Sequence, residues 1–187
     1  MEIRTERLHL REFARDDWRA VLDYQRDPLY LRYYPWTERT EEDARTFVNM
    51  FLGWQSEQPR RRFQLVIVRD SDDRLIGNCG IRRKRDNDWE ADIGYELAPD
   101  CWGHGYATEA AAAIVDFGFG ELGLKRISSW CIADNVASAR VLERLGFQPE
   151  GCLRHNEYFK GHWWDTLLYG LLSDEWRPAL ENTQTEA

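Results

Sequence analysis

Hydrophobic and polar residues alternate along several short stretches of this chain, which is the pattern of half-buried strands. Leu8 and Leu10, for example, alternate with Arg7, His9 and Arg11. Comparable apolar or alternating stretches predict further strands at residues 63–68, 75–81, 90–97, 126–132, 150–158 and 164–172. Together they predict a sheet of about seven strands, since each such stretch supplies one strand.

Apolar residues at helical spacing separate these strands. The clearest case is residues 107–117, where Ala107, Ala110, Ile114 and Phe117 recur every three or four positions. Other helices are predicted from Asp16 to the break at Pro28, from the capping-box pair Thr40 and Asp43 to residue 56, at residues 136–145 before Gly146, and at residues 173–180. Strand–helix–strand units mixed with hairpins predict a mixed α+β sheet flanked by helices. We expect one domain over residues 1–187, with a loose polar tail after about residue 180.

The charge balance narrows the class of partner. The chain has 25 Lys and Arg against 33 Asp and Glu, so its formal net charge is −8 at pH 7. A general nucleic-acid binder needs a basic surface, and we therefore expect no nucleic-acid partner. An acidic protein suits a cationic partner such as an amine.

Cysteine spacing and hydropathy predict neither a metal site nor a membrane partner. The four cysteines, Cys79, Cys101, Cys131 and Cys152, form no C-x-x-C pair, so neither a zinc site nor a disulfide framework is expected. The first residues lack the apolar core of a signal peptide. No uncharged apolar run approaches the roughly 20 residues that span a bilayer. We expect a soluble, cytoplasmic protein.

A glycine-containing loop is the first candidate for chemistry. Residues 100–108, DCWGHGYAT, follow a predicted strand and open a predicted helix. Gly103 and Gly105 let the backbone approach a ligand closely, and free N–H groups at a helix start form an anion site suited to a pyrophosphate. The alternative is an ordinary strand-to-helix turn. The other glycine set, Gly118, Gly120 and Gly123, follows a helix and precedes a strand, so we interpret it as a helix end.

The stretch ADIGYELAPDCWGHGYATEAAAAIVDFGF, residues 91–119, resembles the acetyl-coenzyme A (acetyl-CoA) loop of the GNAT acetyltransferases. The family pattern is Q/R-x-x-G-x-G/A. Gly103 and Gly105 match it, whereas Asp100 replaces the leading Gln or Arg, as is common in the RimJ/RimL-like branch. The segments ERLHLREF, DNVASARVLERLGF and GHWWDTLLYGLLSDEW also resemble that branch, and together they cover nearly the whole chain in the family order.

The resemblance implies a three-layer fold whose central, mostly antiparallel sheet splays between strands 90–97 and 126–132. The pantetheine arm of acetyl-CoA would lie in the gap and pair with the backbone of Leu97 and Ala98. Asn135 and Ser138 would lie near the thioester. The pyrophosphate would bind the loop residues Trp102, Gly103, His104, Gly105, Tyr106, Ala107 and Thr108. No metal is implied.

The implied reaction is direct attack of a neutral amine on the thioester in a ternary complex, which requires a proton for the leaving thiolate. Many relatives place a Tyr seven residues after the Asn, but here that position is Leu142. We therefore predict Ser138 as the acid. Helix capping or cofactor binding is the alternative role for Ser138.

Strand alternation predicts the residues that would handle the amine. Glu90, Asp92 and Glu96 share one face of strand 90–97. We predict that Asp92 and Glu96 remove the proton and that Glu90 binds the ammonium group, with a solvated strand face as the alternative. An α-amino group has a pKa of about 7.7–8.0, against about 10.4 for lysine, so it needs little help from a base.

Aromatic residues in loops and at element ends predict the acceptor pocket. We assign Tyr34, Trp36, Trp89 and Trp163 to it, with a place in the core as the alternative.

The expected function is acetyl transfer from acetyl-CoA to a primary amine, either a protein N-terminus or a small molecule. This is the activity of an N-acetyltransferase, an acyltransferase for non-aminoacyl groups. Two alternatives stay open: an acyl-CoA binding or sensing module without turnover, and a protein-interaction module with exposed aromatics. The resemblance is compatible with a homodimer, which the sequence itself does not reveal.

Overall fold

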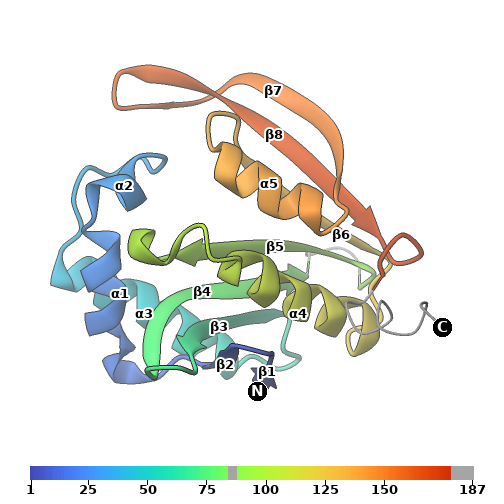
Figure 1. Ribbon diagram of the computed structural model, residues 1–187, viewed down its shortest axis with the longest axis horizontal. Helices are drawn as coiled ribbons and strands as arrows, with labels where there is room; N and C mark the ends of the chain where they lie inside the picture. The colour runs from blue at the N-terminus through green and yellow to red at the C-terminus, as the bar shows by residue number, and fades with distance from the viewer. Residues whose placement is uncertain (84–87, 178–187) are drawn as a thin grey trace.

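One eight-stranded sheet runs through residues 1–83 and 88–177, the part of the chain that the computed structural model describes (Figure 1). Its spatial order is β1-β2-β3-β4-β5-β6-β8-β7. The strands are β1 (Glu2–Arg4), β2 (Leu8–Glu12), β3 (Arg62–Arg69), β4 (Arg74–Arg83), β5 (Glu90–Leu97), β6 (Arg126–Ile132), β7 (Gln148–Phe159) and β8 (His162–Leu172). Neighbours are antiparallel except for β5 and β6, which are parallel. The predicted mixed, mostly antiparallel sheet is confirmed.

The strand count differs slightly from the prediction, because β1 was not expected. This strand has only three residues, and Ile3 is its single apolar one. An alternation needs about four residues or more to be recognised, so a strand this short leaves no pattern. It forms because its residues Glu2 to Arg4 pair with Arg11 to His9 of β2.

Five α-helices connect the strands of the described chain: α1 (Trp18–Gln25), α2 (Pro28–Leu31), α3 (Glu41–Gln55), α4 (Tyr106–Gly120) and α5 (Val136–Arg144). The predicted capping box of α3 is confirmed. The Asp43 amide donates to Thr40 Oγ1 at 3.2 Å, and the Thr40 amide donates to Asp43 Oδ2 at 2.9 Å.

We predicted that Pro28 ends a helix. In the structure it instead opens α2. Proline is well suited to the first turn of a helix, where its missing N–H has no partner to lose. Asp27 caps this turn by accepting the Leu29 amide at 2.8 Å. The predicted helix at residues 173–180 is absent where the structure describes it, since 173–175 form a turn and 176–177 are irregular. Its remainder and the predicted loose tail lie outside the described residues.

The helices form a layer on each face of the sheet (Figure 1). The helices α4 and α5 lie on one face, and α1 and α3 lie on the other. Gly118 lets α4 pack closely, because a Cβ there would lie 2.7 Å from Ile81 Cδ1 and 2.9 Å from Ile127 Cδ1. The β7–β8 hairpin reaches over α5, with its turn on the side of α2. No helix in the described residues is long and apolar enough to span a membrane.

The sheet opens between its two parallel strands. Only three residue pairs join β5 to β6, and the last is Asp92 with Ser128. On its other edge β5 stays paired with β4 as far as Leu97. The predicted splay is therefore present, and it leaves the second half of β5 facing a gap.

Candidate active site

The backbone of β5 offers polar groups to the gap at every second residue. The Ala98 amide donates to the Ile76 carbonyl at 2.7 Å, so Ala98 faces β4. Because alternate residues of a strand direct their N–H and C=O groups to opposite edges, Leu97 and Tyr95 face the gap. The Leu97 carbonyl already accepts a hydrogen bond from the Trp102 indole at 2.9 Å. Of the two predicted backbone contacts, Leu97 is therefore available through its N–H, whereas the N–H of Ala98 is committed to β4.

The glycine loop turns the chain into α4 through two left-handed residues. Gly103 and Gly105 have φ values of +80° and +82°, which side chains rarely allow. The first helical hydrogen bond runs from the Glu109 amide to the Gly105 carbonyl at 3.0 Å. The amides of Tyr106, Ala107 and Thr108 therefore have no acceptor within the helix. Unpaired amides at a helix start suit an anion, which favours the ligand-binding interpretation of this loop.

The amide of Trp102, which we also predicted to bind the pyrophosphate, is already bonded within the protein. It donates to the Pro99 carbonyl at 3.1 Å within the short 3₁₀ turn η2 (Pro99–Cys101). The indole of Trp102 remains at the gap through its bond to Leu97.

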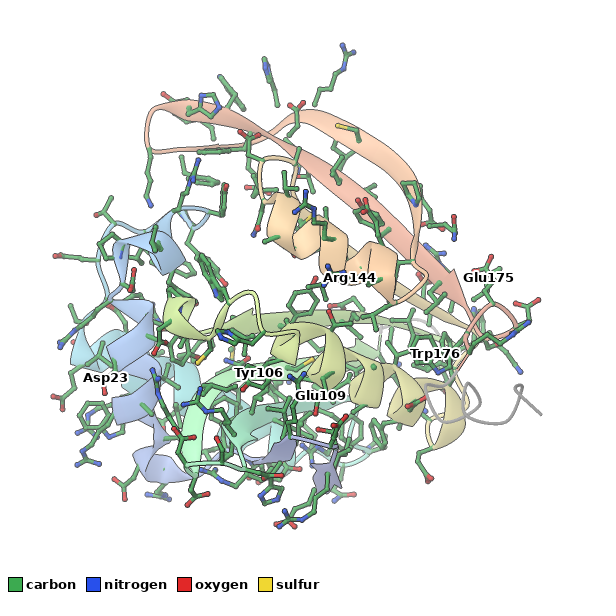
Figure 2. All side chains as sticks on the ribbon, in the orientation of Figure 1. Asp23, Tyr106, Glu109, Arg144, Glu175 and Trp176 are labelled. Atoms are coloured by element: carbon green, nitrogen blue, oxygen red, sulfur yellow. The ribbon has the colours of Figure 1, made fainter. Side chains whose placement is uncertain are left out.

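An ion pair between Arg7, which is exposed, and Glu109, which is half-buried, fixes the loop to the start of the chain. Glu109 accepts hydrogen bonds from Thr5 Oγ1 at 2.6 Å and from Arg7 Nε at 2.7 Å, and Arg7 Nη1 donates to the His104 carbonyl at 3.0 Å. Glu109 and Tyr106 project from the first turn of α4 (Figure 2). Burial opposes the charge of Glu109, but the bonds from Thr5 and Arg7 prevail and lower its pKa. Sequence reasoning missed this pair, although Arg7 lies inside the ERLHLREF segment.

Ser138 lies in the first turn of α5, beside the gap. Its amide donates to Asn135 Oδ1 at 3.2 Å, so Asn135 is the N-cap of the helix. The Tyr95 phenol donates to the Ser138 carbonyl at 2.9 Å and lies 3.1 Å from Ser138 Oγ. Leu142, where many relatives carry a phenol, is fully buried in the core.

Glu96 lies on the opposite face of β5, under α1 and α2. Its carboxylate accepts five hydrogen bonds: from Tyr24 (2.6 Å), Gln25 (3.0 Å) and Asn78 (2.7 Å) at Oε1, and from Tyr30 (2.7 Å) and Tyr34 (3.3 Å) at Oε2. A carboxylate has about four lone-pair sites, so none is left for a substrate proton. Burial, followed by the charge of Glu96, raises the pKa values of Tyr24, Tyr30 and Tyr34. Glu96 is therefore enclosed by donors, whereas we predicted a row of carboxylates open to the substrate.

The other two predicted carboxylates lie at the closed end of the sheet. Asp92 accepts a hydrogen bond from Arg82 Nε at 2.8 Å, and Glu90 forms an ion pair with Arg126 at 3.2 Å. Asp92 is four residues before Glu96, about 13 Å along a strand that rises ~3.3 Å per residue. The structure therefore does not bring Asp92 or Glu90 to the open half of the gap.

The predicted aromatic residues lie in three different places. Tyr34 stacks between Tyr30, at 4.7 Å, and Trp36, at 4.9 Å, so Tyr34 and Trp36 lie beside the Glu96 cluster. Trp89 precedes Glu90 at the closed end of β5.

The Trp163 ring is tilted against Tyr158 at 4.8 Å and stacks with His155 at 5.9 Å, and no ring contact joins it to Tyr34 or Trp36 within the described residues. The residue that faces α2 is its neighbour Trp164, whose ring meets Tyr33 edge-on at 5.8 Å. A sequence pattern cannot tell Trp163 from Trp164 here, because β7 and β8 shift register between Leu153 and Glu157.

Tyr33 and Lys160 connect the end of α2 and the loop after it to the far side of the site. Tyr33 Oη donates to the Asp134 carbonyl at 2.8 Å, next to the α5 cap. Lys160 Nζ, in the turn of the hairpin, donates to the Leu31 carbonyl at 2.7 Å. Both contacts were missed from the sequence, because no local pattern reports a bond between residues 101 or 129 positions apart.

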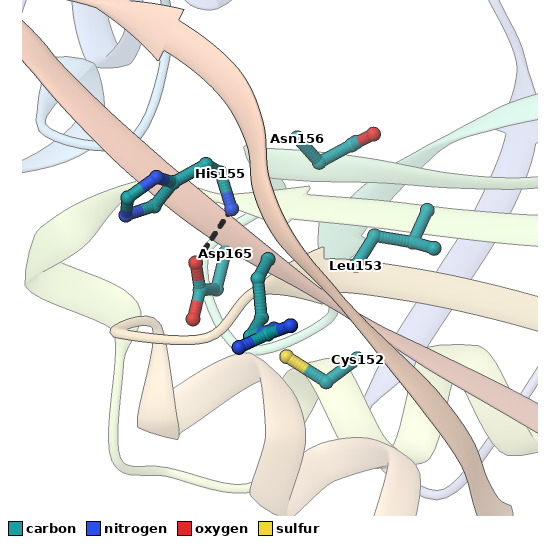
Figure 3. A pocket seen from close by; sticks show the side chains of 6 residues that line it. Cys152, Leu153, His155, Asn156 and Asp165 are labelled. Atoms are coloured by element: carbon teal, nitrogen blue, oxygen red, sulfur yellow. Dashed lines mark hydrogen bonds between the residues drawn. The ribbon is translucent and has the colours of Figure 1, made fainter.

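A separate hollow of about 710 Å³ lies against the hairpin (Figure 3). It is lined by Cys152, Leu153, Arg154, His155, Asn156 and Asp165, at the register shift where the His155 amide donates to Asp165 Oδ1 at 2.8 Å. None of these residues belongs to the Ser138 or Glu96 clusters. No group of three or more metal-ligating side chains is found in residues 1–83 and 88–177.

Residues 7–148 match the sequence model of the acetyltransferase (GNAT) domain. The chain belongs to this family. It is 39% identical over 176 residues to the uncharacterized N-acetyltransferase YnaD of Bacillus subtilis, covering 94% of this chain and 99% of that one. It is 29% identical over 143 residues to the ribosomal-protein-serine acetyltransferase of Escherichia coli, covering 75% and 76% of the two chains. A GNAT acetyltransferase structure from Bacillus anthracis aligns with a TM-score of 0.81 at 32% identity, over 94% of this chain and 100% of that one.

These similarities confirm the predicted family, fold and enzyme class. The protein is a GNAT N-acetyltransferase, and the donor used by that family is acetyl-CoA. The residues present fit this donor, because the free amides of α4 and the open edge of β5 lie at one gap.

Proposed function

We propose that this protein moves the acetyl group of acetyl-CoA to a primary amine by direct attack within a ternary complex. One observation carries the proposal: β5 and β6 separate after Asp92 and Ser128, and the gap is flanked by a helix-start anion site and a serine hydroxyl. Acetyl-CoA supplies an activated acetyl group as a thioester. Everything else that the reaction needs has a candidate among the residues of this chain.

The donor would be held at two places. The amides of Tyr106 to Thr108 suit the pyrophosphate, since they are unpaired and lie at the positive end of the α4 dipole. The pantetheine arm would pair with the open edge of β5 as an added strand. Because the Trp102 indole already binds the Leu97 carbonyl, an arm that uses this carbonyl has to displace the indole. The Leu97 amide would then polarise the thioester carbonyl.

Ser138 is the proposed proton donor to the leaving thiolate. It lies in the first turn of α5, where the partial positive charge of the helix start favours a developing anion. The net reaction moves one proton from the amine nitrogen to sulfur. A hydroxyl that gives one proton and takes another therefore meets the need of both atoms.

Glu96 is proposed to hold the acceptor pocket together rather than to remove the proton. Its five hydrogen bonds fix Tyr24, Tyr30 and Tyr34 on one face of β5, and Trp36 extends this group to the surface. The negative charge at the pocket attracts an ammonium group as it approaches. An α-amine, with a pKa of about 7.7–8.0, then enters partly neutral without a dedicated base.

A protein N-terminus is the first acceptor to test. It fits the low pKa that a site without a free base requires, and the E. coli relative is named as a ribosomal-protein acetyltransferase. Small-molecule amines are the other acceptor class.

Release of CoA thiol would be measured with acetyl-CoA and a panel of N-terminal peptides, polyamines, amino acid derivatives and aminoglycosides. We expect thiol release with at least one peptide. Tight binding of acetyl-CoA without release on any amine would support a sensing module, and absence of acetyl-CoA binding would reject the whole proposal.

A further inference from the structure

One hydroxyl group at the gap has no role in the chemistry described so far, namely the phenol of Tyr95. Tyr95 lies three residues beyond the last β5–β6 pair, so it belongs to the open half of β5. Its side chain points to the α4 and α5 face, opposite to Glu96, because successive strand residues alternate. There its hydroxyl reaches Ser138 at two atoms, the carbonyl oxygen at 2.9 Å and Oγ at 3.1 Å.

These two contacts define where the protons are. A backbone carbonyl can only accept, so the phenol proton is directed to the Ser138 carbonyl. In the second contact the Ser138 hydroxyl is then the donor and Tyr95 Oη the acceptor. Since the Ser138 amide is bound to Asn135, every polar group of Ser138 has a defined partner at rest.

The groups around this contact are neutral. Burial raises the pKa of Tyr95 above its ordinary value, although its bond to Ser138 opposes the change, so the phenol keeps its proton. Burial likewise raises the pKa of Cys131, a neighbour on β6, to about 11, against a hydrogen bond with Ser138. A thiolate formed in the gap would therefore meet Ser138 without a competing anion from either residue.

We propose that Tyr95 is a positioning residue for acetyl transfer, holding Ser138 Oγ at the gap with its proton ready for the leaving sulfur. This inference rests on the proposed function. As the acyl C–S bond breaks, its electron pair stays on sulfur, and the Ser138 O–H turns from Tyr95 Oη to the thiolate and protonates it. Ser138 Oγ takes the proton that the amine nitrogen loses as the C–N bond forms.

The turn is favourable and needs only a small movement. A hydrogen bond from a hydroxyl to an anion is shorter and roughly twice as strong as one between neutral groups. Rotation about the Cβ–Oγ bond of Ser138 is sufficient, because it moves only the hydroxyl hydrogen. The Tyr95 bond to the Ser138 carbonyl stays in place throughout. Tyr95 thus keeps the oxygen fixed while the proton changes partner.

The test is a double-mutant cycle with Tyr95→Phe, Ser138→Ala and the double variant. Tyr169→Phe is the matched control, since the Tyr169 hydroxyl also contacts α5, but at Glu143 Oε1, 3.3 Å away, and has no hydrogen bond to Ser138 in the described residues. Thiol release gives kcat and the KM for acetyl-CoA, at a temperature below the melting transition of each variant. Only folded protein is then compared.

We expect Tyr95→Phe to lower kcat about 10- to 100-fold, part of the ~10²–10⁴ that a placed acid contributes, with KM for acetyl-CoA within about twofold of wild type. The double variant should be no slower than Ser138→Ala, because residues that act as a unit are not additive. Tyr169→Phe should retain the wild-type kcat.

Three results would overturn the inference: an unchanged kcat in Tyr95→Phe, losses that multiply fully in the double variant, or a Tyr95→Phe chain that does not fold at any assay temperature. The last would make Tyr95 purely structural. If wild type releases no thiol with any acceptor, the proposed function fails and this inference fails with it. The wild-type rate therefore tests the function, and the ratio of Tyr95→Phe to wild type tests the role of Tyr95.

Discussion

Glu96 and Ser138 differ in how much of their hydrogen-bonding capacity the folded protein has already used. Five donors surround the Glu96 carboxylate, so it is fixed and has no lone pair left for a substrate proton. Ser138 Oγ has neutral partners, Tyr95 and Cys131, which a stronger acceptor can replace. Residue type alone suggests that Glu96 is a base and that Ser138 caps a helix. The surroundings of the two side chains instead suggest a structural role for Glu96 and proton transfer by Ser138.

Ser138→Ala is expected to lower kcat by about 10²–10⁴, the contribution of a placed general acid, and to leave KM for acetyl-CoA near its wild-type value. The reason is that the thiolate then leaves unprotonated. Steady-state thiol release measures both constants. Ser128→Ala is the control, since Ser128 Oγ bonds the Ala91 carbonyl at the closed end of β5. A Ser138→Ala enzyme with wild-type kcat would contradict the acid role.

Glu96→Gln is expected to lower the free energy of unfolding by about 1–3 kcal/mol, because the neutral amide loses the charge that strengthens the hydrogen bonds to this side chain and its new NH₂ can no longer accept from the surrounding donors. Thermal or urea denaturation measures this loss, with the exposed Glu38→Gln as control. The pH dependence of kcat/KM should keep its wild-type shape. Loss of its acidic limb in Glu96→Gln would instead identify Glu96 as the base.

At the scale of elements, the turn from β5 into α4 was predicted more completely than any other part of the site. Its glycines, its helix start and its place after a strand are all local features, so the sequence carries them. The sequence did not reveal that the Trp102 and Ala98 amides are bonded to the Pro99 and Ile76 carbonyls, because these contacts depend on the geometry of the turn and on strand register. Tyr33 and Trp164 were missed for the same reason, since each depends on a distant element.

Gly105→Ala tests the loop as an element. A left-handed residue other than glycine costs roughly 1–2 kcal/mol, and the new Cβ would lie 3.4 Å from Arg7 Nη2. We expect a higher KM for acetyl-CoA with a smaller change in kcat, measured by thiol release. Gly120→Ala, in the last turn of the same helix with nothing within 4 Å of its Cβ, is the matched control. Equal KM values in the two variants would argue against an anion site at the start of α4.

At the scale of the whole molecule, Glu109 links the start of the chain to the coenzyme loop through Thr5 and Arg7. Its pKa is lowered in the folded protein, so its stabilising effect is present above about pH 4.5 and is lost as the pH falls through the folded value.

The free energy of unfolding of wild type should therefore exceed that of Glu109→Gln most clearly near neutral pH. The difference should shrink as the solution is acidified below about pH 4.5. Urea unfolding at a series of pH values measures it. Glu121→Gln, an exposed residue just after α4, is the control and should show no such trend. A difference independent of pH would contradict the charged role of Glu109.

The short pairing of β5 with β6, only three residue pairs long, also has a consequence for hydrogen exchange. Amides of Tyr95 and Leu97 face the gap, whereas their neighbours Glu96 and Ala98 face β4. Exchange should therefore alternate from residue to residue along the end of β5, with Tyr95 and Leu97 exchanging fast and Ala98 slowly. Adding CoA should slow exchange of the Leu97 amide most, so that the alternation along the end of β5 gives way to uniform protection. NMR can follow this change at single amides.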